Sequence, residues 1–196
     1  MAEPFRAAYA ATFHEPGDFA DIAKQLLLMD AHMRDPKTGL LRHGWDESKK
    51  MPWADAQTGL SPEVWGRAMG WYAMALVDVL DWMPADQPQR PELVAALNRT
   101  MAAVVKYQDA KTGLWWQVMD KGGRAGNYTE ASASCMFIYA LAKGVRMGYL
   151  PQADEASARR GWEGIQKAFV TTADGKMALS GTVTVGGLGG KPYRSG

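Results

Sequence analysis

The sequence predicts an all-α protein built from antiparallel helical hairpins, on the strength of three observations. Apolar residues recur with helical periodicity along the 196-residue chain. Segments rich in Gly, Ala and Ser alternate with ordinary amphipathic segments, as an inner and an outer layer of helices would require. Short connections alternate with long ones: 14–17, 35–60, 83–90, 108–128, 149–153 and 171 onward. An (α/α) toroid or an α-solenoid with its long loops on one rim fits this pattern, while a helix bundle or a repeat scaffold remains compatible.

Six helices are expected, over residues 1–13, 18–34, 61–82, 91–107, 129–148 and 154–170. The first reads as the end of an apolar helix, and Asp18 is placed to cap the second. Ser61-Pro62-Glu63 predicts the start of the third, because it combines a hydroxyl N-cap, a proline and an acid in the first turn. The turns MPADQP and YLPQAD separate the later helices. From residue 171 the chain is Gly-rich and shows no closing element.

A short motif recurs where the chain leaves a helix for a long loop. DPKTGLLRH at 35–43 returns as DAKTGLWWQ at 109–117, with ADGKMAL at 173–179 as a faint third copy. Recurrence at equivalent places is typical of stacked helical hairpins, so one domain spanning 1–196 is expected, with no second domain.

Composition excludes several kinds of partner and cofactor. A net charge of +1 gives no electrostatic footprint for nucleic acid or an anionic membrane. No apolar run approaches the length of about 18 residues needed to span a bilayer. His14, His32 and His43 lack the spacing of metal ligands, so we expect no structural metal.

The stretch from 42 to 72 concentrates the candidate site residues, which are His43, Trp45, Trp53, Trp65, Arg67 and Trp71. Indole faces beside a few polar groups are the usual lining of a sugar site, and a guanidinium suits capture of a carboxylate, so an acidic sugar is the expected ligand. The alternatives are that the indoles fill the core and that Arg67 pairs with Glu63. Trp65 lies roughly 200° round an ideal helix from Arg67, so both reach one site only if Trp65 leans over the rim.

The acid/base candidates are Asp46, Glu47, Asp55 and Glu63, each of which also fits a cap or a solvated loop charge. His43 suits a sugar hydroxyl or proton transfer, or equally a backbone tether. One alternative is therefore a conventional two-carboxylate glycosidase using Asp46 and Glu63. Another is a non-catalytic α-hairpin scaffold that binds a protein, with its tryptophans in the core.

Three stretches carry a resemblance to a known family: HGWDESK with TGLSPEVWGRAMGWYAMALVDVLD, then GNYTEASASCMFIYALAKG, then GGLGGKPYRSG. They closely resemble the unsaturated rhamnogalacturonyl hydrolases, glycoside hydrolase family 105 of the 88/105 superfamily. The resemblance implies an (α/α)6 six-hairpin toroid, of which this chain holds about three hairpins, and a bacterial cytoplasmic enzyme of pectin degradation that needs no cofactor. In such enzymes an aspartic acid protonates the C4–C5 double bond of a terminal unsaturated galacturonic acid. Water then adds at C5, and the hemiketal collapses to release the neighbouring sugar.

The resemblance assigns His43, Trp65, Arg67 and Trp71 to substrate binding, with Trp45 and Asp46 matching the motif in less defined roles. The family's catalytic aspartate precedes a segment matched here by MAEPF, so it would fall before Met1 and no catalytic residue is assigned in this chain. We therefore expect a fragment that is inactive alone and that self-associates through its exposed flanks.

Overall fold

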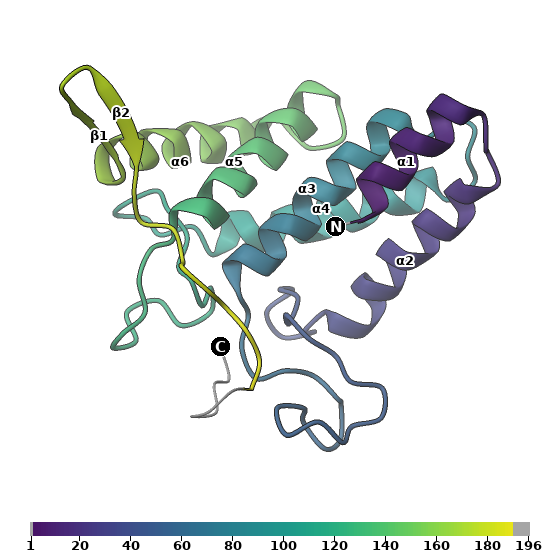
Figure 1. Cartoon of the computed structure of the whole chain (residues 1–196), viewed down its shortest axis with the longest axis horizontal. Helices are drawn as coiled ribbons and strands as arrows, with labels where there is room; N and C mark the ends of the chain where they lie inside the picture. The colour runs from purple at the N-terminus through teal and green to yellow at the C-terminus, as the bar shows by residue number, and fades with distance from the viewer. Residues whose placement is uncertain (1, 190–196) are drawn as a thin grey trace.

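The computed structural model describes residues 2–189, so Met1 and the end of the GGLGGKPYRSG stretch lie outside it. Three helical hairpins follow one another along the chain (Figure 1). The helices are α1 (Ala2–Phe13), α2 (Asp18–Met33), α3 (Gly66–Trp82), α4 (Arg90–Lys106), α5 (Ala131–Arg146) and α6 (Glu155–Ala168). A 3-10 turn, η1 (Gln152–Asp154), leads into α6. The all-α prediction is confirmed, and five of the six helices begin within two residues of their expected start.

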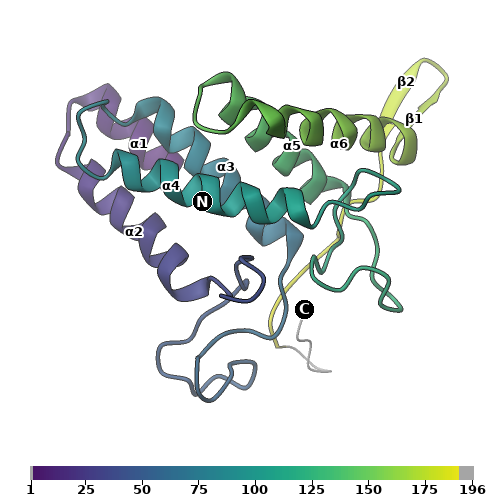
Figure 2. The same cartoon turned by 180° about the vertical axis from the view of Figure 1, so that it is seen from behind.

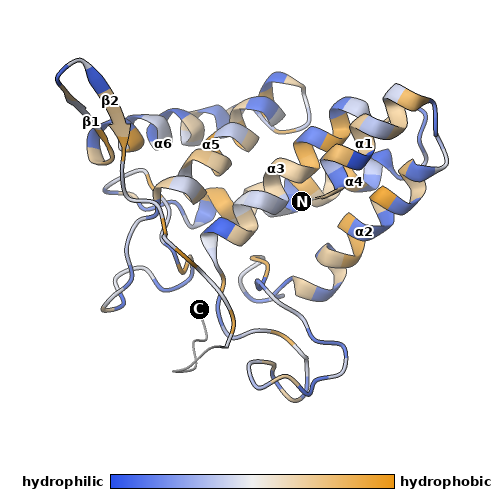
Figure 3. Cartoon of the chain, viewed as in Figure 1, coloured by the Kyte–Doolittle hydropathy of each residue, from blue (hydrophilic) through white to orange (hydrophobic). Residues whose placement is uncertain are grey.

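The helices form two layers, as the alternation of helix types predicts. Helix α3 packs between α1 and α5 in one layer. In the second layer, α2 packs against α1, α4 against α3 and α6 against α5. The long loops 35–65 and 107–130 project from the same end of the helices in both views (Figures 1 and 2). These loops are mostly hydrophilic in Figure 3, whereas hydrophobic residues concentrate on the helices. The loops therefore form a polar rim at one end of the layered core.

Small side chains explain the close approach of α3 and α5. Helix α3 buries Gly66, Gly70 and Ala73, and α5 buries Ala133 and Ser134. Backbones approach closely where side chains are short, so buried apolar area is gained without overpacking.

The start of α3 differs from the prediction, because the helix begins at Gly66 rather than at Ser61. The preceding segment is extended, and Trp65 forms a β-bridge with Val118 in the second long loop. The amide of Gly66 donates to the carbonyl of Gln117, and the amide of Met119 donates to that of Val64. Pairing with a distant segment thus satisfies backbone groups that a local helix would otherwise have used. Asp18 likewise provides no side-chain cap to α2.

The tail holds an element that helical periodicity missed. Strands β1 (Val170–Ala173) and β2 (Lys176–Leu179) form an antiparallel hairpin beside α6. Asp174 and Gly175 make its turn, both with positive φ. The expected third copy of the loop motif, at 173–179, is therefore wrong.

Candidate functional site

Three turns of one kind shape the rim, and all three carry the sequence D-x-x-T-G-L. They occupy residues 35–40, 55–60 and 109–114, so the true third copy lies inside the first long loop. In each turn the Asp carboxylate accepts from the backbone amides two and three residues ahead. In each, the Gly amide donates to the Asp carbonyl, and the Asp amide donates to the carbonyl of Leu. Each copy of the repeat therefore forms a turn whose hydrogen bonds lie within its own six residues, and the chain continues from it along the rim.

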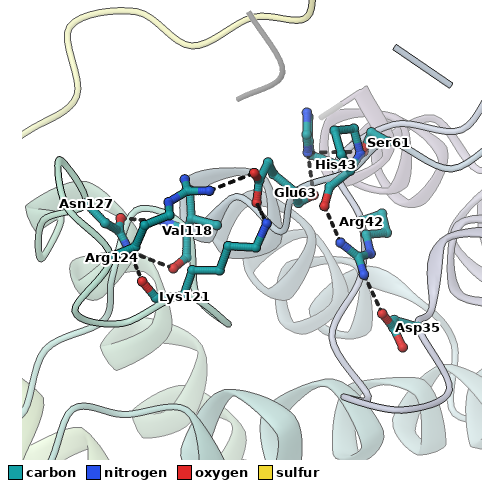
Figure 4. A network of polar contacts seen from close by, with 10 residues as sticks. Asp35, Arg42, His43, Ser61, Glu63, Val118, Lys121, Arg124 and Asn127 are labelled. Carbon is teal, nitrogen blue, oxygen red and sulfur yellow. Dashed lines mark hydrogen bonds and ion pairs between the residues drawn. The ribbon is translucent and has the colours of Figure 1, made fainter. Parts of the chain in front are cut away.

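The residue eight positions after each Asp occupies an equivalent place beyond its turn. These residues are His43, Glu63 and Gln117. The segments that carry Glu63 and Gln117 are joined by the backbone bonds around Trp65 and Val118. Arg42 donates to Asp35 and to the carbonyl of Pro62, and these two bonds join the first turn to the segment that precedes α3 (Figure 4).

His43 is held as a neutral imidazole against an indole. Its ring stacks on Trp65 with centroids 4.1 Å apart and 5° between the planes. Its Nδ1 lies 2.7 Å from the carbonyl oxygen of Glu63, which can only accept, so Nδ1 carries the proton and Nε2 is an acceptor. Burial lowers the pKa of His43. Among the described residues Nε2 is buried and has no hydrogen-bond partner.

Three of the expected substrate residues meet in one pocket, which we call the rim pocket. Its larger lobe has a volume of about 370 Å³ and is lined by Trp65, Arg67 and Trp71. Trp65 reaches the pocket because its backbone is extended (φ −81°, ψ 121°) and it precedes the helix. The expected separation of about 200° between Trp65 and Arg67 on an ideal helix therefore does not arise. His43 stacks on Trp65 but is not among the residues that line the pocket.

A strap of residues 181–187 forms the other wall of the rim pocket. The Arg67 guanidinium donates to the carbonyl of Val183 (2.9 Å), and the Val183 amide donates to the Glu130 carboxylate (2.8 Å). Gly186 lies against Trp65, where a Cβ would stand 2.9 Å from the indole ring. Figure 1 shows the strap descending from β2 toward the two long loops. The alternation of connection lengths placed the chain from 171 onward on the same rim as the other long loops, but it did not indicate that this segment forms a wall of the pocket.

The rim pocket has a second, smaller lobe of about 220 Å³. Both lobes share Trp65, Gln117, Val183, Val185 and Gly186. The smaller lobe adds Tyr128, Asn127 and Arg124 from the second long loop. Gln117 was not identified as a site residue from the sequence, although it occupies the same position in DAKTGLWWQ that His43 occupies in DPKTGLLRH.

Glu63 is engaged in a structural ion network and does not pair with Arg67. Lys121 and Arg124 contact its carboxylate at 2.7 and 2.8 Å (Figure 4). Burial opposes ionisation of Glu63, but the hydrogen bonds from Lys121 and Arg124 prevail and lower its pKa. The network holds the second loop against the segment that precedes α3.

Asp46, Trp45 and Trp53 lie away from the rim pocket. Asp46 accepts from the amides of Met51, Lys50 and Ser48, and these bonds lower its pKa and close a local turn. Trp45 stacks on His32 at 4.0 Å. Trp53 lines a separate cleft together with Arg42.

The rim pocket is basic and aromatic, and none of the described residues that line it is Asp or Glu. In the part of the chain that the structure describes, no three His, Cys, Asp or Glu side chains are grouped to hold a metal ion. No helix between residues 2 and 189 has the length and apolar character needed to cross a bilayer. The indoles and Arg67 face an open pocket rather than lying under other helices, unlike what the scaffold hypothesis requires.

Comparison with known proteins identifies the relatives of this chain. The profile of Glycosyl Hydrolase Family 88 matches residues 1–195. Protein Atu3128 of Agrobacterium fabrum is 40% identical over 204 residues, which cover 100% of this chain and 86% of that protein. The unsaturated rhamnogalacturonyl hydrolase YesR of Bacillus subtilis is 32% identical over 141 residues, covering 72% of this chain and 38% of that enzyme.

Solved structures give the same result for the fold. A glycoside hydrolase from family 105 of C. acetobutylicum superposes with a TM-score of 0.95 at 45% identity, covering 98% of this chain and 54% of that one. A possible family 105 member from Salmonella enterica gives a TM-score of 0.76 at 28% identity, covering 92% of this chain and 44% of that one. The chain thus spans about half the length of these solved structures. The predicted six-hairpin fold class and the family resemblance are confirmed.

Proposed function

Because the chain belongs to Glycosyl Hydrolase Family 88, we propose that its rim pocket binds the unsaturated galacturonic acid at the non-reducing end of rhamnogalacturonan oligosaccharides. The observation that carries the proposal is the convergence of Trp65, Arg67 and Trp71 on one lobe. The name of the Bacillus relative supports the choice of substrate.

Each part of the lobe matches a part of this sugar. The double bond between C4 and C5 flattens the ring, and a flat ring suits packing on an indole face. The carboxylate carried by C5 is an acceptor for the Arg67 guanidinium, which has five donors and spends one on Val183. The half-buried setting strengthens this pairing relative to water.

Binding is tested by titrating an unsaturated galacturonyl-rhamnose disaccharide into the chain, with ligand-observed NMR as the readout. Arg67→Gln should weaken binding about tenfold or more, because it removes a charge-assisted hydrogen bond. Arg159→Gln is the matched control, since Arg159 is an exposed arginine on α6 that pairs only with Glu155 among the described residues. A neutral disaccharide without the carboxylate should bind both Arg67→Gln and wild type equally weakly. Equal affinity of wild type and Arg67→Gln for the acidic disaccharide would refute the proposal.

We further propose that the 196-residue chain binds this sugar without hydrolysing it. The two carboxylates of the conventional alternative are held in structural bonds, Asp46 in its turn and Glu63 in its ion network, and both have lowered pKa values. A general acid needs a raised pKa and access to the substrate. Loss of the ultraviolet absorbance of the double bond measures turnover. Turnover that Asp46→Asn or Glu63→Gln abolishes would favour the two-carboxylate mechanism instead.

A further inference from the structure

We infer that Gln117 is a further sugar-binding residue of the rim pocket and that its amide hydrogen-bonds the C2 hydroxyl of the bound uronic acid. The inference rests on the proposed function, because it names a contact made to the same sugar. Two independent observations lead to it: the state of the Gln117 side chain, and its place in the internal repeat.

The Gln117 side chain is buried yet lacks a partner. The residue is only 8% exposed, and its Oε1 has no hydrogen-bond partner among the described residues. If the side-chain amide is flipped, Nε2 takes the position of Oε1 and is without a partner instead. One atom of the amide therefore lacks a hydrogen bond in either orientation. A buried polar atom without a partner costs folding free energy, and such atoms are retained where a ligand completes them.

The backbone of Gln117 is fixed on both sides, so the unpartnered amide is not the result of a loose loop. Its amide nitrogen donates to the carbonyl of Tyr128 (2.8 Å), and its carbonyl accepts from Gly66 (2.9 Å) at the start of α3. The side chain therefore enters the pocket from a rigid support, as a binding group must.

The internal repeat gives a second reason. Gln117 stands eight residues after Asp109, as His43 stands eight residues after Asp35. Both positions converge on one indole, because His43 stacks on Trp65 and Gln117 lines both lobes together with Trp65. Each also presents a buried polar atom that has no partner within residues 2–189. Two equivalent loops thus each bring a residue with one unpartnered polar atom beside Trp65, and of these two residues Gln117 lines the pocket.

The position of Gln117 selects the hydroxyl. The unsaturated uronic acid has free hydroxyls only at C2 and C3, since C1 carries the linkage, C4 and C5 the double bond and C6 the carboxylate. Arg67 lines only the larger lobe, which places the carboxylate there, whereas Gln117 lies where the two lobes meet. The next sugar then extends into the smaller lobe. The hydroxyl beside the linkage, at C2, is the one that falls at Gln117.

Gln117→Leu tests the inference, with Gln108→Leu as a matched control. Gln108 is fully engaged: its Nε2 donates to the carbonyls of Gly113 and Ser157, and its Oε1 accepts from Ser157 and Arg160. Gln117→Leu should weaken binding of the unsaturated disaccharide about tenfold while leaving the unfolding midpoint unchanged or raised. Gln108→Leu should lower the unfolding midpoint and leave the affinity unchanged. A purely structural role for Gln117 predicts the reverse, a lower midpoint with unchanged affinity.

A 2-deoxy form of the disaccharide completes the test. Wild type should bind it about tenfold more weakly than the parent, and Gln117→Leu should show no further loss. If wild type binds the disaccharide and Arg67→Gln loses it, while Gln117→Leu binds normally, the role of Gln117 is overturned and the proposed function stands. If wild type does not bind the disaccharide at all, the proposed function fails and this inference fails with it.

Discussion

His43 shows how one side chain links the fold to the chemistry of the rim. Its Nδ1 bond to the Glu63 carbonyl fixes the ring, the stack on Trp65 orients the indole, and Nε2 is left as an acceptor. Burial favours the neutral ring, which is the only form that keeps Nε2 able to accept. Protonation of this ring should therefore disturb stability and the site together.

Stability should fall as the pH drops below about 6.5, the ordinary pKa of histidine, toward the lowered pKa of His43 in the folded protein. Between these two pKa values the unfolded chain binds a proton at His43 that the folded chain does not bind, so lowering the pH favours unfolding. Unfolding midpoints measured between about pH 8 and pH 5.5 should show a smaller slope for His43→Asn than for wild type. The control is His14→Asn, at an exposed histidine with φ of 59°, a conformation that asparagine tolerates. An unchanged slope in His43→Asn would contradict this assignment.

Gly59 tests the turn that recurs along the rim. Its φ is +78°, and an added Cβ would stand 2.3 Å from the carbonyl oxygen of Asp46. Gly59→Ala should lower the free energy of unfolding by about 3 kcal/mol or more, through backbone strain and steric clash. Gly126→Ala isolates the strain, because φ is +82° there and nothing lies within 4 Å, and it should cost about 1 kcal/mol. Urea unfolding measures both, and equal losses would argue against the clash.

At the scale of elements, Glu130 joins a helix to the strap. It is fully buried, and its carboxylate accepts from the amides of Ser132 and Ala133, at the start of α5, and from that of Val183. One side chain therefore caps α5 and anchors the wall of the rim pocket.

Glu130→Ala should lower the free energy of unfolding by about 3 kcal/mol, since it removes a cap and leaves buried amides unpaired. It should also speed proteolysis within residues 181–187. Glu92→Ala, at an exposed acid in the first turn of α4, should change stability by less than about 0.5 kcal/mol and leave proteolysis unaltered. The prediction fails if the two variants are equally stable in urea.

How far the elements follow from sequence depends on the range of the interactions that form them. The helices were predictable because their apolar faces are local patterns. The start of α3 was not, because Val64 and Trp65 pair with a segment more than 50 residues further on, and the amide of Ser61 donates to the carbonyl of Gly44. Arg67 was expected to meet either Glu63 or a ligand, but Glu63 meets Lys121 and Arg124 instead. Gln117 was within reach of sequence reasoning, since the repeat alone relates it to His43.

At the scale of the molecule, the layered array leaves an apolar stripe on one flank. Phe5, Tyr9 and Phe13 project from one face of α1, with ring centroids 6.4 and 4.5 Å apart along the row. The first and last of these are 73% and 60% exposed. A contiguous aromatic stripe of this kind favours association.

We expect the chain to self-associate with rising concentration in sedimentation velocity. The double variant Phe5→Glu with Phe13→Glu should reduce this association, because charge at the stripe opposes its burial. Met177→Glu is the control, at a 77% exposed side chain on β2 away from α1, and should leave association unchanged. A monomer at every concentration would show that the stripe does not drive association.

The strap has a consequence for the timing of assembly. Arg67 and Val183 are 116 residues apart in sequence, and their contact closes one wall of the pocket. Contacts of such long range form late, because the loop between them must be ordered first. During translation, α3 leaves the ribosome long before its wall is made, so a nascent chain should gain affinity for the sugar only after Val183 has emerged. Sugar binding would thus report completion of the fold, whereas helix content would appear much earlier.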